Sequence, residues 1–349
     1  MSNSSTDAPL LSVNNLEVQF ALRQGAVTAL RDLNFTLKRG ERLGVVGESG
    51  AGKSVLGFSI INLISKPGSI TKGEVVYEGQ NLAVMNNNQL RSIRGNRIAM
   101  IFQDPMMTLN PVLTIGDQMV ECLHAHRKIS KAEARAIALD KLQQVQIPSP
   151  DTRLDQYPHE LSGGMRQRIV IAISLLLDPD LIIADEPTTA LDVTIQAEIM
   201  GLILNLCEEH NVALMLITHD LGVVAEVTQT TMVMYAGRII EQGPTQDIIH
   251  HPRHPYTQGL INALPQMATP GQRLNQIPGS MPSLQSIPDG CAFRLRCDKA
   301  IKACESVVPD LQIQQTVQVA CHLYAPETMQ ASSLNTSQTD AKVGGLINE

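Results

Sequence analysis

GVVGESGAGKS, residues 44–54, lies between a short apolar run and the helical-looking stretch VLGFSIINLI. It contains the spacing G-x-x-x-x-G-K-S, with Gly47, Gly52, Lys53 and Ser54 at the fixed positions. Glycines let backbone N–H groups turn inward around phosphate oxygens, and the N-terminus of the following helix adds the positive end of its dipole. Lys53 would neutralise phosphate charge and the Ser54 hydroxyl would ligate Mg²⁺. The stretch therefore predicts a nucleotide-phosphate site rather than a glycine-rich turn that binds nothing.

Apolar runs alternate with amphipathic helical stretches on both sides of this loop. The runs are RLGVVG, RIAMIF, DLIIAD, ALMLIT and TMVMYAG. This alternation predicts an α/β domain with a largely parallel sheet over residues 10–250. Over residues 105–160 the β pattern is lost, and SKAEARAIALDKLQQV has a serine cap followed by helix formers, which predicts a helical subdomain.

The residues after Pro252 have a different composition. HPRHPYTQGL and PGSMPSLQSIPDG are too rich in proline for regular elements, so we expect a separate carboxy-terminal module over residues 251–325. Residues 1–9 and 326–349 are polar and rich in small side chains, and we expect both tails to be disordered.

Composition excludes several classes of partner and location. The net charge is -7 and the 27 basic residues are scattered, whereas a nucleic-acid site concentrates them on one element. The start of the chain has neither a secretory nor a transit pattern, and no apolar run approaches the ~18 residues of a membrane-spanning helix. We therefore expect a cytoplasmic protein that does not bind nucleic acid.

A second nucleotide element is LIIADEPTTALD, in which a buried strand ends at Asp185 and Glu186. Ligands of an open α/β sheet bind at the carboxyl ends of its strands, which brings these carboxylates close to the phosphate loop. Asp185 is the candidate for holding hydrated Mg²⁺, and Glu186 for the general base that polarises the attacking water. By itself the pair could equally be a solvated strand end.

The stretch LSGGMRQR, residues 161–168, makes the resemblance specific: residues 11–250 resemble an ATPase of the ABC type, with a mixed sheet core and a helical subdomain. Ser162, Gly163 and Gly164 open a helix and offer a hydroxyl and backbone donors to an anion, although a plain capped helix would look the same. In the family this tip binds the γ-phosphate of ATP held by another subunit. The resemblance assigns to ATP the residues Gly47, Glu48, Ser49, Gly50, Ala51, Gly52, Lys53, Ser54 and Val55.

The same resemblance implies roles for four more residues, each of which would otherwise be an ordinary polar or core side chain. Gln103 in IFQDP would join the helical subdomain to the Mg²⁺ site, and His219 in LITHD would contact the γ-phosphate. Asp192 in TALD would communicate across a dimer, and Phe20 in NLEVQF would stack on adenine. The sequence departs from the family at Met165, where most members have glutamine.

Over residues 10–325 the chain is similar to ATP-binding subunits of bacterial dipeptide, oligopeptide and nickel importers, on stretches such as MIFQDPMMTLNP and HPYTQGL. This implies an ATPase at the cytoplasmic face of the membrane that serves two permease subunits and an extracellular or periplasmic solute-binding protein. Met165 points to one of two paralogous types, and hence to a heterodimer. The alternatives are a nickel or other small-solute importer, a non-transport ABC protein, or a metal-sensing interaction protein.

Four cysteines cluster near the end as C-x5-C-x6-C-x16-C: Cys291, Cys297, Cys304 and Cys321. A reducing cytoplasm disfavours disulfides, so the cluster points to a metal site. The spacing matches neither tight zinc pairs nor common ferredoxin patterns. Some peptide-importer ATPases that this chain resembles carry a [4Fe-4S] cluster here, which makes the cluster the leading prediction, with zinc or free thiols as alternatives.

Overall fold

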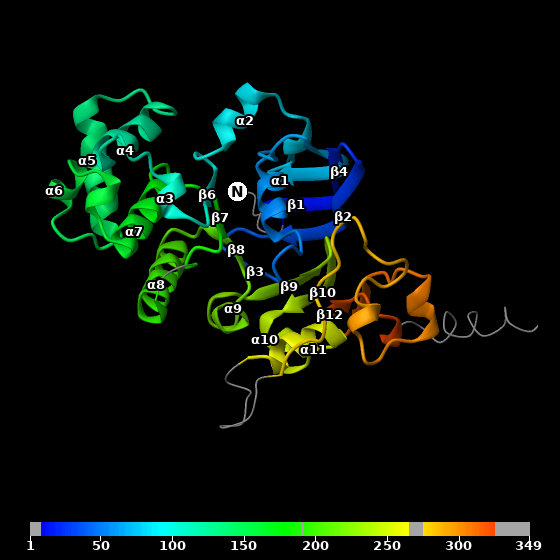
Figure 1. Ribbon diagram of the computed structural model, residues 1–349. Coiled ribbons are helices and arrows are strands. Elements are labelled where there is room, and N and C mark those ends of the chain that lie inside the picture. Colours follow the sequence, from blue (N-terminus) through cyan, green and yellow to red (C-terminus); the bar gives the residue numbers. More distant parts are fainter. Residues whose placement is uncertain (1–7, 190–191, 265–274, 325–349) are drawn as a thin grey trace, which may run out of the picture.

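The computed structural model describes residues 8–189, 192–264 and 275–324 (Figure 1). The predicted disordered tails, residues 1–9 and 326–349, lie outside the described residues except for residues 8 and 9.

An eight-stranded sheet forms the centre of the molecule, in the order β11-β12-β10-β9-β3-β8-β7-β6. Its strands are β3 Arg42–Val46, β6 Ile98–Ile101, β7 Leu181–Asp185, β8 Ala213–Thr218, β9 Thr230–Tyr235, β10 Arg238–Pro244, β11 Gln312–Gln314 and β12 Val317–Val319. Strands β6, β7, β8, β3 and β9 are parallel, whereas the other pairings are antiparallel. The five predicted apolar runs are the five parallel strands, and the sheet as a whole is mixed, as predicted.

Both faces of the parallel strands are buried. Leu214 and Leu216 of β8 belong to one hydrophobic core cluster, and Met215 and Ile217 belong to the other. Side chains alternate between the two faces of a strand, so a strand covered on both faces is apolar throughout. This explains why these runs were visible in the sequence without an alternating pattern.

A second, four-stranded antiparallel sheet in the order β2-β1-β4-β5 was not predicted. Its strands are β1 Leu11–Leu22, β2 Gly25–Leu37, β4 Gly68–Tyr77 and β5 Gln80–Asn81. The pairing of β1 with both neighbours contains register shifts, which interrupt the alternation of apolar and polar residues by which an antiparallel strand is found. The sheet connects to the central one where the Arg31 amide donates to Gly237 O.

Helices α3 to α7 form one end of the molecule, beyond strand β6 (Figure 1). Ser130 caps the helix predicted from SKAEARAIALDKLQQV by accepting from the Glu133 amide. The α-helices are α1 Lys53–Ile60, α2 Asn87–Ile93, α3 Pro105–Thr108, α4 Ile115–His124, α5 Lys131–Gln144, α6 Pro150–Leu154, α7 Gly163–Ser174, α8 Val193–Glu209, α9 Leu221–Val227, α10 Thr245–His250 and α11 Pro255–Asn262. Short 3-10 helices are η1 Leu82–Val84, η2 Pro158–Glu160, η4 Arg294–Arg296, η5 Lys302–Glu305 and η6 His322–Tyr324.

The carboxy-terminal residues differ from the prediction in one respect. HPRHPYTQGL was expected to lack regular structure, but helix α11 begins within it. Pro255 occupies the first turn, where its missing N–H costs nothing, and His254 caps the helix. Strand β12 pairs with β10, so this part of the chain also extends the central sheet. The boundaries predicted for the domains stay predictions.

Candidate functional site

The phosphate loop connects β3 to α1, and two of its glycines are required by their surroundings. Gly47 has a φ of 155°, and a Cβ there would lie 2.4 Å from Met234 O. Gly52 has a φ of 102°, and its Cβ would lie 2.9 Å from the Leu30 side chain. Any other residue would be strained at both positions and would clash. The loop therefore keeps a backbone conformation that only glycine adopts without strain at these two positions.

Lys53 is the first residue of α1, and only 5% of it is exposed. Its ammonium group donates to Gly47 O at 2.8 Å and to Glu48 O at 3.1 Å. Burial lowers the pKa of Lys53, and the charges of Glu186 and Asp185 oppose this shift. The loop thus encloses a buried positive charge, which is the group that a triphosphate requires.

Ser54 and Asp185 meet at the start of α1 and the end of β7. The Ser54 hydroxyl donates to Asp185 Oδ1 at 3.0 Å, and Asp185 is 3% exposed. Burial raises the pKa of Asp185, the hydrogen bond from Ser54 opposes the shift, and the charge of Glu186 adds to it. A hydroxyl and a carboxylate are oxygen ligands, so this pair fits Mg²⁺.

Glu186 is held by three side chains from three different segments. Its Oε2 accepts from Gln103 Nε2 at 3.0 Å and from Thr189 Oγ1 at 2.9 Å, and its Oε1 lies 3.3 Å from His219 Nδ1. Burial acts to raise the pKa of Glu186, but the hydrogen bonds from Thr189 and His219 outweigh it, so the pKa is lowered. The carboxylate is therefore ionised and oriented near neutral pH.

A cavity of about 450 Å³ lies beside the Ser54–Asp185 pair, and Lys53, Glu186 and His219 do not line it. Ser54, Gln103 and Asp185 line it, together with Phe58 and Met107. It provides room beside the Mg²⁺-type ligands at the point where the phosphate loop, β6 and β7 end. The carboxyl ends of strands are where ligands of an open α/β sheet bind.

The predicted signature residues lie apart from this cavity. Ser162 caps α7 by accepting from the Met165 amide at 3.3 Å, and the Gly164 backbone packs against Ile195 of α8. Asp192 caps α8 by accepting from the Ile195 amide. No hydrogen bond recorded for the described part of the chain joins Ser162, Gly163 or Gly164 to the phosphate loop. Their predicted roles, like the others in the site, stay predictions.

Phe20 lies half-buried on β1, where it packs against Gly68 of β4. The described contacts do not bring it to the phosphate loop, so adenine stacking also stays a prediction.

Sequence reasoning missed three residues of this site. Thr189 follows Glu186 closely in the EPTT stretch, and a hydroxyl three positions after the base was a local signal. Tyr256 and Arg296 both contact Glu48 of the phosphate loop from more than 200 residues away. No pattern of neighbouring residues in the sequence predicts contacts of this kind.

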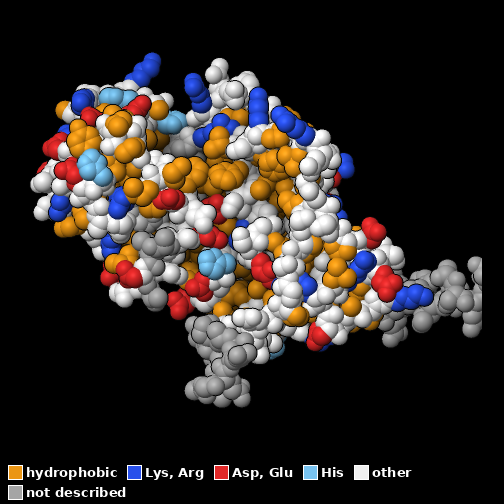
Figure 2. Space-filling view, in the orientation of Figure 1, with side chains coloured by type: hydrophobic (Ala, Val, Ile, Leu, Met, Phe, Trp, Pro, Cys, Tyr) orange, Lys and Arg blue, Asp and Glu red, His pale blue; other side chains and the backbone are white. Residues whose placement is uncertain are grey.

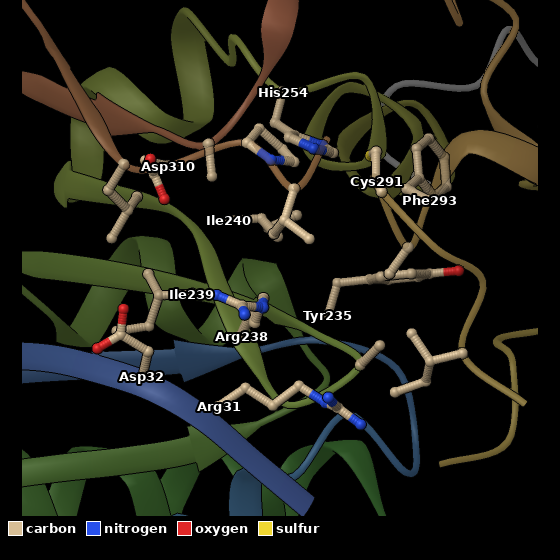
Figure 3. Close-up of a pocket in the computed structure, with 18 of the residues that line it drawn as sticks. Arg31, Asp32, Tyr235, Arg238, Ile239, Ile240, His254, Cys291, Phe293 and Asp310 are labelled. Carbon is tan, nitrogen blue, oxygen red and sulfur yellow. The ribbon is translucent and has the colours of Figure 1, made fainter. Parts of the chain in front are cut away.

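A larger cavity, of about 800 Å³, lies elsewhere, between β2, β10 and the carboxy-terminal residues (Figure 3). Arg31, Asp32 and Arg238 line one side of it, and His254 and Phe293 line another. None of the predicted nucleotide residues line this cavity.

The metal prediction is wrong for the four clustered cysteines. They lie in one region, where the Cys291 amide donates to Cys304 O, but no three His, Cys, Asp or Glu side chains among the described residues form a group that could hold a metal ion. Burial raises the pKa of Cys291 to about 11 and that of Cys321 to about 11. Neither the [4Fe-4S] cluster nor zinc is supported; within the described ranges these cysteines are free thiols.

Two family models match the chain. An ABC transporter model matches residues 30–189, and a model of the carboxy-terminal region of oligopeptide/dipeptide transporters matches residues 240–304. None of the helices in the described ranges is long and apolar enough to cross a membrane.

Relatives match over almost the whole chain. A probable peptide ABC transporter ATP-binding protein of Sinorhizobium fredii is 50% identical over 323 residues, which are 92% of this chain and 96% of the relative. The oligopeptide transport ATP-binding protein OppD of Salmonella typhimurium is 47% identical and covers 88% of this chain and 93% of its own length. The dipeptide transport ATP-binding protein DppD of Bacillus subtilis is 48% identical, with 87% and 91% covered.

Solved structures agree with this assignment. The ATP-binding cassette MJ0796 bound to ADP and phosphate has a TM-score of 0.61 and 28% identity, and it covers 67% of this chain and 98% of its own. It is described as a dimeric structure of that one cassette. The prediction of a heterodimer rested on Met165 alone, and none of the relatives or structures named here supports it. The site geometry and the relatives together show that the chain belongs to the ABC ATPases, in the family of ATP-binding proteins of oligopeptide and dipeptide transporters.

Proposed function

We propose that this chain hydrolyses ATP to drive the import of peptides through a separate membrane permease, on the cytoplasmic face of the membrane. The observation that carries the proposal is the arrangement around Glu186: an oriented, ionised carboxylate stands beside the Ser54–Asp185 pair and the buried Lys53. The peptide substrate class comes from the relatives, which are named for peptide, oligopeptide and dipeptide transport.

The residues divide the chemical work by position. Lys53 and the N–H groups of the phosphate loop bind the phosphates, and Ser54 with Asp185 would hold Mg²⁺. Mg²⁺, when bound, neutralises charge on the β- and γ-phosphates. Glu186 accepts the proton of the attacking water, while Gln103 and Thr189 fix the carboxylate that receives it.

His219 adds a polar group that can adapt to the nucleotide state. Its side chain is 64% exposed and touches Glu186 Oε1 from the end of β8. An exposed imidazole can leave the carboxylate and bind a γ-phosphate oxygen with little cost. We assign it this contact, which keeps Glu186 free for the attacking water.

A second ATP-binding cassette completes the site. Ser162, Gly163 and Gly164 form an accessible helix tip with a serine hydroxyl and free N–H groups, and that tip lies away from the chain's own phosphate loop. It therefore serves the nucleotide of a second subunit, with Asp192 at the start of the neighbouring α8. The dimeric cassette structures support this arrangement.

The permease would dock beside Gln103. Five large hydrophobic side chains between residues 63 and 112 are exposed, in the part of the chain that also provides most of the lining of the smaller cavity: Leu63, Val84, Met106, Met107 and Val112. Met107 is 86% exposed and also lines the cavity itself. Figure 2 shows hydrophobic side chains gathered across the upper middle of this face, between the helical end and the smaller sheet. An exposed apolar surface of this kind marks a protein contact. Gln103 would couple that contact to Glu186 through its hydrogen bond to the carboxylate.

The proposal is tested in vesicles that contain the permease, with the chain and ATP on one side and the solute-binding protein on the other. We expect uptake of a labelled tripeptide that stops when Lys53 is replaced by alanine. Uptake of Ni²⁺ but not of peptide would contradict the assignment and favour the small-solute alternative. None of the relatives described above is named for that kind of transport.

A further inference from the structure

The phosphate loop is contacted by the carboxy-terminal part of the chain at two of its residues. The Glu48 carboxylate accepts two parallel bonds from Arg296, from Nη1 to Oε2 at 2.9 Å and from Nη2 to Oε1 at 3.0 Å. The Glu48 amide donates to the Tyr256 hydroxyl at 2.9 Å. Next to it, a Cβ built on Gly50 would lie 3.2 Å from the terminal methyl of Met281. The loop is therefore held at Glu48 through both the backbone amide and the side-chain carboxylate.

Arg296 is itself fixed in place. Its side chain is 7% exposed, and its Nε donates to Pro278 O at 2.8 Å. The guanidinium carbon lies 5.9 Å from the centre of the Tyr235 ring and 5.8 Å from that of Phe293. Burial acts to lower the pKa of Arg296, but Glu48 outweighs it and the pKa is raised. A planar cation that packs against two neighbouring rings and is paired at both terminal nitrogens is held rigidly towards the loop.

The charge of Glu48 gives this pair a consequence for nucleotide binding. Glu48 lies in the loop that binds a triphosphate, and its charge acts on Lys53, whose ammonium group also donates to Glu48 O. An unpaired carboxylate here would repel phosphate and compete for Lys53. Arg296 supplies a charge of opposite sign at hydrogen-bond distance.

We propose that Arg296 is a positioning residue for ATP, which holds the phosphate loop and neutralises Glu48, so that the carboxy-terminal segment sets the affinity of the site for nucleotide. Tyr256 assists it by fixing the Glu48 amide. The proposal rests on the proposed function of the site as an ATP site.

The test measures binding of a fluorescent ATP analogue, methylanthraniloyl-ATP with Mg²⁺, to the whole chain. Arg296→Ala should weaken binding about tenfold, because the carboxylate loses its partner beside the phosphates. In phosphate release, KM for ATP should rise more than kcat falls. Arg296→Lys keeps the charge but cannot make both bonds, so about threefold weaker binding is expected, and it serves if the alanine variant does not fold.

A double-mutant comparison separates charge from architecture. In the Glu48→Gln variant, the further substitution Arg296→Ala should change the dissociation constant for the ATP analogue less than twofold, because no carboxylate is left without its partner. The matched control is Arg294→Gln, in the same 3-10 helix as Arg296. It removes contacts to the backbone oxygens of Asp289 and Glu305 and should leave affinity unchanged.

Three results would overturn the proposal. One is an equal loss of nucleotide affinity when Arg296→Ala is made in the wild-type chain and in the Glu48→Gln variant. Such a result would mean that Arg296 has a merely structural role. The second is a loss in Arg294→Gln as large as that in Arg296→Ala. The third is unchanged affinity in Arg296→Ala while the wild type binds, which leaves the proposed function intact. A wild-type chain that binds no analogue instead refutes the proposed function, and the inference falls with it.

Discussion

Replacing Glu186 with glutamine should stop hydrolysis while nucleotide binding remains. The amide has nearly the same shape, and its oxygen can take the position of Oε2, which accepts from Gln103 and Thr189. Its NH₂ group then faces His219 Nδ1, where Oε1 now lies. The change therefore removes the base and its charge but leaves the side chain in place.

The size of the effect follows from these contacts. A positioned general base contributes about 10²- to 10⁴-fold, so phosphate release should fall by that factor, or about 3 to 5 kcal/mol in the activation free energy. The charge of Glu186 raises the pKa of Asp185, so its removal also lessens the negative charge around the phosphates. ATP binding should consequently be retained or slightly stronger, and an ATP-bound dimer should accumulate.

The assay compares phosphate release with binding of methylanthraniloyl-ATP, and size-exclusion chromatography with light scattering detects the dimer. Glu198→Gln is the matched control: it makes the same chemical change on α8, where Glu198 pairs with Arg168 and neither residue lines the cavity, and it should leave the rate unchanged. Undiminished phosphate release by Glu186→Gln would refute the assignment of the base. Loss of ATP binding together with hydrolysis would refute the reasoning that the amide preserves the site.

Four further predictions test separate parts of the structure. Lys53→Ala should abolish measurable binding of the ATP analogue, and retained binding would contradict the assignment of the buried ammonium group. Ser162→Ala should cost about 1 kcal/mol of stability through the lost cap and should slow hydrolysis without weakening ATP binding to the isolated chain; a parallel loss of binding would contradict a role towards a second subunit. Burial lowers the pKa of His254 from 6.5 to about 3, so between pH 7.5 and pH 5 this imidazole is protonated in the unfolded chain but not in the folded chain. The free energy of unfolding should therefore fall by about 2 kcal/mol over this range. Urea unfolding checks this, since His254→Gln should lose that part of the pH dependence. Leu216→Ala, in the buried centre of β8, should destabilise the chain by about 2 to 5 kcal/mol, and an unchanged thermal midpoint would contradict its place in the core.

The features that the sequence alone determined are those that depend on neighbouring residues. Gly47 and Gly52 occupy fixed positions of a local loop motif, and the five parallel strands are apolar because each is covered on both faces. Asp185 and Glu186 follow from the place where one of these strands ends. For such features composition, spacing and order along the chain are sufficient.

The tertiary structure alone decided which distant side chains meet. Gln103, Glu186 and His219 come from three strand ends, and their hydrogen bonds depend on the order of strands in the sheet. Arg296 reaches Glu48 across 248 positions of sequence.

The four cysteines show the reverse case: clustered spacing predicted a metal site, but no group of three His, Cys, Asp or Glu side chains in the described ranges could hold a metal ion. Spacing along a chain fixes how far two residues can be apart, whereas packing fixes where their side chains point. For this reason the nucleotide loop could be predicted from the sequence, whereas its contacts with the carboxy-terminal segment could not.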